Sequence, residues 1–248
     1  MDIGVCSIAY SQYGKYVEPF LKSCNQMNPK PKQVTIVLGK DHGCKDIEAL
    51  RLLFKNLVIV EDNGEPTMGR LRNLSVKNTP NEWILYCSVD DLIEKSAIRT
   101  FKKFQEADYI CAKWSRIGLD GKTTQHSSVT PYEAYKRIKE HHKGGFIVGH
   151  SPFKRWLWEK TPYEEHDYPN SPFVLGCVRN GAKFTKSDKP TTIYIKHADS
   201  HSRTTLLLPE EKRKAIKYKR QYEMGIRDYY TNLRAKKIRR RMKLRRQV

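Results

Sequence analysis

The sequence lacks any long hydrophobic run. Its apolar stretches, such as 34–38 and 57–60, are short and are separated by turn-forming residues. None approaches the roughly 18 apolar residues that a membrane-spanning helix needs. The first residues also lack the basic segment and apolar stretch of a signal peptide. We therefore expect a cytoplasmic protein without a transmembrane segment.

The sequence also lacks closely spaced cysteine pairs. A structural zinc site needs paired ligands at short spacing, so the cysteines do not indicate one. The six cysteines are scattered within or beside apolar runs, at Cys6, Cys24, Cys44, Cys87, Cys111 and Cys177. This placement is typical of small core residues in a reducing compartment.

Acidic residues are few, and the resulting charge is uneven. The chain has 47 Lys and Arg against 27 Asp and Glu, a net charge of +20. Residues 212–248 hold 16 of these basic residues and two acids, so they carry +14 and the other 211 residues carry +6. We expect a globular domain over 1–208 and a basic helical extension over 209–248. Such an extension binds polyanions, either nucleic acid or an anionic membrane surface.

Strand-like and helix-like patterns alternate through the first hundred residues. The expected elements are strand 2–9, helix 16–26, strand 33–38, helix 46–54, strand 57–61, helix 68–77, strand 83–88 and helix 94–105. This order, with short connections, predicts an α/β fold with a mostly parallel, Rossmann-like sheet flanked by helices. Ligands of such sheets bind at the carboxyl ends of the strands.

The second half of the chain is less regular. We expect strands at 109–113 and 191–196, helices at 131–142, 155–160 and 171–180, a hairpin turn at 119–122 and a long helix from 209.

Two adjacent carboxylates follow the expected strand 83–88. A buried strand that ends in Asp90 and Asp91 is costly unless something pairs their charges. Mg²⁺ and Mn²⁺ take oxygen ligands and commonly bridge protein carboxylates to diphosphates. The alternative is that one of the two aspartates caps the helix that follows. The residues alone leave both interpretations open.

Three segments together resemble family 2 of the glycosyltransferases, the large inverting family with the GT-A fold. They are the opening strand, loop and helix at 5–23, the Gly-x-x-Arg-Asn stretch at 69–73, and the strand that ends in Ser88-Val-Asp-Asp91. The last segment stands where the family has an Asp-x-Asp-Asp signature, so Ser88 replaces the first aspartate. The family's proline after the first strand is Ala9 here. Its acidic pair after the second strand is replaced by Gly39-Lys40, which leaves Asp41 one step further on.

The resemblance implies a hexosyltransferase that uses a nucleotide-sugar, by default a UDP-sugar, together with Mn²⁺ or Mg²⁺. It implies that Asp90 binds the metal directly and that His197, after the last strand, returns a second ligand. A lone histidine without this resemblance is usually not a ligand. The residues that it places at the donor are Ala9, Tyr10, Ser11, Asp41, Arg72, Asn73, Ser88, Asp90 and Asp91. The alternative for Arg70 and Arg72 is that they are solvated helix charges.

The resemblance also implies a catalytic base in the acidic segment 163–168. An inverting transfer needs a carboxylate to take the proton of the acceptor hydroxyl. By this match Asp167 is the first candidate and Glu165 the second. The alternative is an acidic surface turn.

The basic extension is the main indication of the acceptor. The cations that we expect to bind nucleic acid are Lys236, Lys237, Arg239, Arg240, Arg241, Lys243, Arg245 and Arg246. Aromatic residues are interleaved with the basic ones, and basic grooves with aromatic platforms hold unstacked nucleic acid. We therefore expect a DNA-base glycosyltransferase that modifies a 5-hydroxymethylated pyrimidine such as 5-hydroxymethylcytosine. Such hypermodification is a bacteriophage trait, so the protein would work in the host cytoplasm.

Two other functions remain open. One is a glycosyltransferase for a surface polysaccharide or a lipid-linked acceptor, with the extension lying on anionic lipid. The other is a non-catalytic nucleic-acid-binding protein that keeps the fold without the first signature aspartate.

Overall fold

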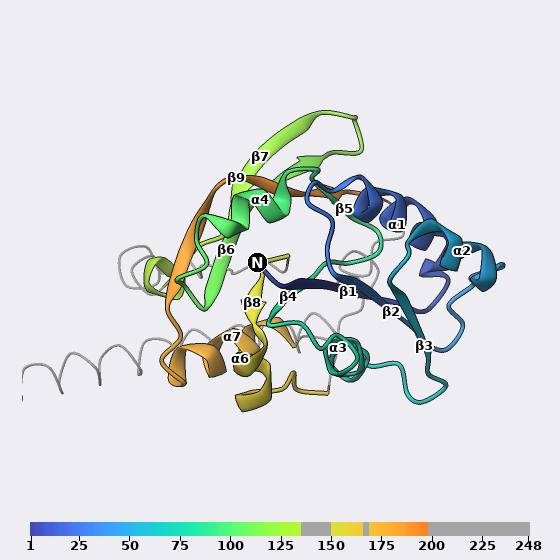
Figure 1. The fold of residues 1–248 in the computed structure, drawn as a ribbon, viewed down its shortest axis with the longest axis horizontal. Helices are drawn as coiled ribbons and strands as arrows, with labels where there is room; N and C mark the ends of the chain where they lie inside the picture. Colours follow the sequence, from blue (N-terminus) through green and yellow to red (C-terminus); the bar gives the residue numbers. More distant parts are fainter. Residues whose placement is uncertain (135–149, 166–168, 198–248) are drawn as a thin grey trace, which may run out of the picture.

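The structure is a computed structural model that describes residues 1–134, 150–165 and 169–197. Within these ranges the chain forms a nine-stranded, curled sheet with helices on both faces (Figure 1). The expected α/β fold with a mostly parallel sheet is therefore confirmed. The basic extension 209–248 lies outside the described residues.

Four parallel strands form one half of the sheet, in the order β3-β2-β1-β4. They are β1 (Ile3–Ala9), β2 (Gln33–Leu38), β3 (Leu57–Glu61) and β4 (Trp83–Tyr86). In register, Val5 of β1 lies opposite Val34 of β2 and Leu85 of β4. Because all four strands run in the same direction, their carboxyl ends meet at one edge of the sheet.

The other half of the sheet mixes the two strand directions. Continuing from β4, the order is β8 (Phe153–Lys154), β6 (Tyr109–Ile117), β9 (Phe184–Ile195) and β5 (Leu92–Ile93), while β7 (Thr123–Ser127) pairs with β6. β8 is antiparallel to both β4 and β6, and β9 is parallel to β6. The strands β6 and β9 therefore run in the direction of β4, and their carboxyl ends lie at the same edge.

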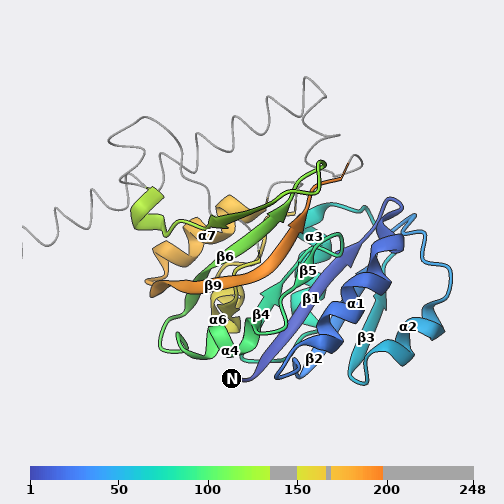
Figure 2. The same cartoon turned by 90° about the horizontal axis from the view of Figure 1, so that it is seen from above.

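The helices cover both faces of the sheet. α1 (Val17–Gln26), α2 (Ile47–Leu53) and α4 (Ala97–Lys102) lie on one face, and α3 (Met68–Lys77), α6 (Arg155–Lys160) and α7 (Asn170–Arg179) lie on the other (Figures 1 and 2). A short 3₁₀ helix, η1 (Tyr13–Tyr16), precedes α1. Figure 2 shows α1 lying along β1 and β2.

The side chains of β1 point alternately to the two faces of the sheet, where the core forms two layers. Ile3, Val5 and Ala9 pack with the α1 face, and Cys6 and Ile8 pack with the α3 face. Successive side chains of a strand point to opposite faces, so an apolar strand buried on both sides supplies both layers.

Four of the expected elements agree with the structure at both ends. The bounds 33–38, 57–61, 68–77 and 155–160 coincide with β2, β3, α3 and α6. The expected helix 94–105 is shorter, at Ala97–Lys102, and at its start the amide of Glu94 extends the pairing of β5 with β9 by donating to the carbonyl of Thr191. The strands expected at 109–113 and 191–196 are longer, because β6 and β9 pair along most of their lengths. The helix expected at 131–142 is described only as far as Ala134.

Two further expectations concern the cysteines and the membrane. All six cysteines are free, and all but Cys44 are buried. Among the described residues, no helix has both the length and the apolar character that crossing a membrane requires.

Candidate functional site

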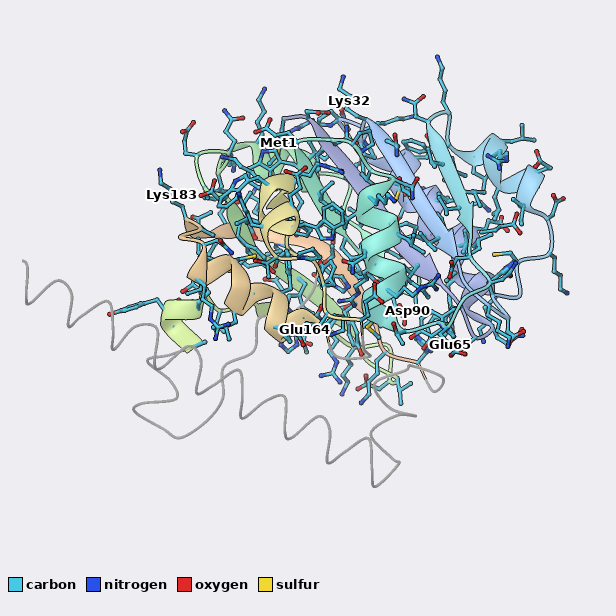
Figure 3. The ribbon with its side chains drawn as sticks, turned by 90° about the horizontal axis from the view of Figure 1, so that it is seen from below. Met1, Lys32, Glu65, Asp90, Glu164 and Lys183 are labelled. Carbon is cyan, nitrogen blue, oxygen red and sulfur yellow. The ribbon has the colours of Figure 1, made fainter. Side chains whose placement is uncertain are left out.

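The candidate site lies at the edge where the parallel strands end. Figure 3 shows Asp90, Glu65 and Glu164 at this edge and Met1, Lys32 and Lys183 at the opposite edge. The loops after β1, β2 and β4 and the residues after β9 all reach it. It is the edge at which the sequence places most of the expected site residues.

The loops after β1 and β2 are joined by backbone hydrogen bonds. The amides of Ser11, Gln12 and Gly14 donate to the carbonyls of 40, 41 and 42 at 3.3, 2.7 and 2.6 Å. Ser11 and Gln12 both have positive φ, 50° and 70°, and Asp41 has φ 56°. Left-handed backbone at non-glycine residues costs about 1–2 kcal/mol each, and such residues cluster at ligand-binding positions.

The four expected donor residues of these two loops differ in exposure. Ser11 and Asp41 are exposed and Tyr10 is half-buried. Ala9 is fully buried in the core layer of α1, and its carbonyl accepts from Gly39 at 2.8 Å. A ligand at the edge can therefore reach the first three side chains, whereas the side chain of Ala9 faces the core.

Asp90 and His197 meet at the centre of the edge. The Oδ2 atom of Asp90 lies 2.9 Å from Nε2 of His197, although 107 residues separate them in sequence. The Nδ1 atom of His197 lies 3.1 Å from the hydroxyl of Tyr16, and the two rings pack at 4.9 Å. The ends of β4, β9 and η1 thus come together through three polar side chains. The Asp90 and His197 side chains are only 13 % and 15 % exposed.

The environment of Asp90 disfavours its negative charge. Burial is the main cause that raises the pKa of Asp90, and the neighbouring carboxylate of Asp91 raises it further. The hydrogen bond from His197 acts in the opposite direction. A carboxylate in such a place is stabilised by a nearby cation.

Asp91 points away from Asp90 and into the protein. One of its oxygens accepts from the amide of Ile195 at 2.9 Å, and the other lies 2.9 Å from Nε2 of His150. The side chains of Asp91 and His150 are 2 % and 6 % exposed. Its carboxylate thus ties the loop after β4 to β9 and to the chain entering β8, and its expected contact with the donor stays a prediction. Ser88 accepts the amide hydrogen of Asp91 through its carbonyl, at 3.1 Å, and so closes the turn.

His150 is a residue that the sequence reasoning missed. It is buried, with a positive φ of 68°. Its pairing with Asp91 depends on the fold, and no motif around position 150 indicates it.

Arg72 on α3 is buried rather than solvated. It is 4 % exposed, and its guanidinium lies 4.1 Å from the ring centre of Tyr86 and 5.7 Å from that of Tyr163. It donates to the side chain of Asn170. Burial opposes its charge, but the phenols of Tyr86 and Tyr163 outweigh this, so the pKa of Arg72 is raised. No carboxylate among the described residues pairs with it, and its Nε has no hydrogen-bond partner there.

Arg70, in the first turn of α3, lies in a different environment. Its guanidinium contacts both carboxylate oxygens of Asp62 at 2.5 and 2.7 Å. It is therefore an ion-paired residue at the edge of the site, and neither arginine is an unpaired solvated charge.

The side chain of Asn73 makes three hydrogen bonds to two residues. Its side-chain oxygen accepts from the amide of Tyr163 and from Nε1 of Trp158, both at 2.9 Å. Its side-chain nitrogen donates to the carbonyl of Tyr163 at 2.9 Å. These bonds hold α3 against α6 and the segment that follows; contact of Asn73 with the donor stays a prediction.

The segment after α6 crosses α3 at Gly69. A Cβ atom on Gly69 would collide with the carbonyl oxygen of Glu164, so only glycine allows this crossing. The crossing brings the exposed residue Glu165 to the site edge, where its charge acts on Arg70. The other candidate base, Asp167, lies outside the described residues, as do the eight cations of the extension.

Comparison with known proteins shows the fold. No protein-family model matches the sequence, and no curated protein matches it significantly. The structure resembles residues 1–349 of S. aureus TarS in complex with UDP-GlcNAc, with a TM-score of 0.61 and 19 % identity over 81 % of this chain and 60 % of the TarS 1–349 chain. It also resembles the same TarS segment in complex with UDP, with a TM-score of 0.61 and 17 % identity over 90 % of this chain and 65 % of the TarS 1–349 chain. The chain thus spans less than two thirds of these two TarS structures. It has the GT-A fold of these structures, with Asp90 and His197 at the carboxyl edge of the sheet.

Proposed function

We propose that this protein is a glycosyltransferase that moves a sugar from a UDP-sugar to a hydroxyl group. The observation that carries the proposal is the contact between Asp90 and His197, at the edge where ligands of parallel α/β sheets bind. The likeness to TarS bound to UDP-GlcNAc and to UDP supports a UDP-sugar as the donor. Ser11 and Asp41, exposed on the two linked loops, are the nearest candidates to contact the nucleoside.

Asp90 and His197 are suited to hold Mn²⁺ or Mg²⁺. A carboxylate oxygen and an imidazole nitrogen form a donor pair that Mn²⁺ accepts. The described residues contain no group of three or more His, Cys, Asp or Glu that could bind a metal. The remaining ligands would therefore come from the donor diphosphate and water. When bound, the cation supplies positive charge that stabilises the departing diphosphate.

The transfer itself requires one proton acceptor. The carboxylate of Glu165 or of Asp167 takes the proton of the acceptor hydroxyl. The hydroxyl oxygen forms a bond to the anomeric carbon as the bond from that carbon to the diphosphate oxygen breaks, and UDP leaves with the electron pair. Attack from the face opposite the diphosphate inverts the configuration at this carbon.

The acceptor that we propose is a 5-hydroxymethylated pyrimidine in DNA. The support is the net charge of +14 in residues 212–248, which favours a polyanionic partner. A hydroxymethyl group on a base lies within a duplex, so the enzyme would take the base out of the stack or act on single strands.

Product analysis tests this function. The protein is incubated with UDP-GlcNAc or another UDP-sugar, Mn²⁺ and DNA that contains 5-hydroxymethylcytosine, and the digested nucleosides are analysed by mass spectrometry. We expect a nucleoside heavier by one sugar residue, and its loss in the variants Asp90→Asn and His197→Gln. Asp188→Asn is the matched control, because Asp188 pairs with Lys103 on the surface, away from the site.

The possible outcomes separate the alternatives. If no donor gives a sugared nucleoside but the donor is hydrolysed in a way that depends on Asp90, DNA is rejected as the acceptor and the glycosyltransferase is kept. Activity that is equal in Asp90→Asn and in Asp188→Asn would reject the proposed site.

A further inference from the structure

A basic and aromatic face lies where β6, β7 and β9 approach the site. Trp114 and Arg116 of β6 are two residues apart, so their side chains share one face of the sheet. His126 of β7 lies directly opposite Trp114, and Tyr194 of β9 lies opposite Arg116. Directly opposed residues share a face. We call these four residues, together with Lys122 and Lys196, the β6–β7–β9 face.

The aromatic part of this face is an ordered cluster. The rings of Trp114 and His126 stack with centres 4.4 Å apart and planes 17° apart. Tyr194 meets Trp114 edge to face at 5.7 Å. All three side chains are half-buried, so they present ring surface on a sheet that Figure 1 shows projecting beyond the helices.

The charged part of the face lines a cleft. The cleft has a volume of about 390 Å³, and Arg116, Lys122 and Lys196 contribute three positive charges to its lining. The lining also contains one carboxylate, that of Asp120, which lies 4.0 Å from Lys122 and balances one of the three positive charges. The lining is therefore net positive, which favours an anionic ligand.

Two donors on this face have no acceptor. Among the described residues, neither Nε of Arg116 nor Nε1 of Trp114 has a hydrogen-bond partner. Both atoms are buried, so neither contacts a ligand in the cleft directly, but Arg116 lines the cleft with the rest of its half-buried side chain. Phosphodiester oxygens are acceptors with a negative charge, and arginine binds them well.

The face is continuous with the proposed transfer site. Lys196, in the lining of the cleft, directly precedes His197, which contacts Asp90. The amide of Lys196 donates to the carbonyl of Ile117 at 3.0 Å, so its position beside β6 is fixed by the backbone. The cleft and the site therefore both adjoin the carboxyl end of β9.

We infer that the β6–β7–β9 face is the acceptor-binding surface and that it holds single-stranded DNA. Arg116 and Lys196 bind phosphodiester groups, and the cluster around Trp114 contacts an unstacked base, as in basic grooves with aromatic platforms. The acceptor role depends on the proposed function, whereas binding of DNA to this face does not. The inference adds a surface within the described domain to the cations of the extension.

The test compares two double variants that lose the same charge. Arg116→Gln/Lys196→Gln removes two cations from the face, and Lys32→Gln/Lys183→Gln removes two exposed cations from the opposite edge (Figure 3). Binding of fluorescein-labelled oligothymidine to the full chain is measured by anisotropy at several salt concentrations. Each phosphate contact to single-stranded DNA contributes about −0.7 to the slope of log K against log salt.

We expect the face variant to bind more weakly and to flatten the slope by about 1.4, the value for two contacts. The control variant should keep the wild-type slope. The single variant Lys196→Gln, expected to flatten the slope by about 0.7, replaces the double variant if thermal melting shows that the latter is unfolded. Equal slopes for the face and control variants would overturn the inference.

A second measurement separates this inference from the proposed function. Hydrolysis of UDP-GlcNAc in the absence of acceptor should be the same in the face variant and in wild type, and transfer to DNA should show a raised KM for DNA. A flattened slope without any donor hydrolysis would keep the DNA-binding face and reject the glycosyltransferase. Unchanged slopes with normal donor hydrolysis would reject the DNA-binding face and keep the glycosyltransferase.

Discussion

Replacing Asn73 with alanine should destabilise the protein without weakening donor binding. The variant removes two hydrogen bonds to the backbone of Tyr163 and one to Nε1 of Trp158. Each group left without a partner costs about 1–3 kcal/mol when it is buried. Tyr163 is 5 % exposed and Trp158 is half-buried. Water entering the space left by the side chain recovers part of the loss, so we expect a total of about 2–4 kcal/mol.

The assay is thermal and urea unfolding, with UDP binding measured well below the melting temperature. A loss of 2–4 kcal/mol corresponds to a fall in Tm of roughly 4–16 °C for a chain of this size. The control is Asn25→Ala on α1, because the side-chain oxygen of Asn25 accepts only an exposed bond from Lys30. We expect that variant to change stability by less than about 0.5 kcal/mol. If Asn73→Ala lowers the affinity for UDP and leaves the stability unchanged, this reasoning is refuted and Asn73 contacts the donor.

Three further predictions concern packing, the buried contact between Asp91 and His150, and thiol reactivity. Gly69→Ala should lower the free energy of unfolding by about 1–3 kcal/mol, because the new Cβ meets the backbone of Glu164. Alanine in place of glycine usually stabilises a helix by about 1 kcal/mol, and such a gain in urea unfolding would contradict the close crossing at Gly69. Asp91→Ala should lower the free energy of unfolding by about 2–6 kcal/mol, about 1–3 kcal/mol for each of the two buried donors that lose their acceptor, His150 and the amide of Ile195. A loss under about 1 kcal/mol would show that the pair is not structural. In native protein, iodoacetamide should label Cys44 alone among the six cysteines, and slowly, because burial raises its pKa. Intact-mass analysis that finds two or more adducts before unfolding would disagree with the burial of the other thiols.

The sequence was sufficient to predict the framework of the fold. The strands β2 and β3 and the helix α3 appear at their expected bounds, because their apolar residues mark the segments that pack in and on the sheet. The two-residue strands β5 and β8 could not be predicted, since so short a segment has no periodicity. Their existence depends on the neighbouring strands that they join.

The site was predictable only in part, for a similar reason. The motif positions place Asp90 and His197 at strand ends, and the fold brings them into contact. The directions of Asp91 and Asn73 depend on partners distant in sequence, His150 and Tyr163, which no local pattern identifies. The roles of these residues in donor and metal binding remain predictions.

Binding of UDP in the presence and absence of Mn²⁺ tests the central claim most directly. Isothermal titration calorimetry is carried out on wild type, Asp90→Asn, His197→Gln and the control Asp188→Asn. A bound cation contributes several kcal/mol to holding a diphosphate, so we expect Mn²⁺ to tighten UDP binding by about a hundredfold or more in wild type and in the control. The two site variants should lose this enhancement. Equal UDP affinity with and without Mn²⁺ in wild type, or an enhancement that survives in Asp90→Asn, would contradict the account.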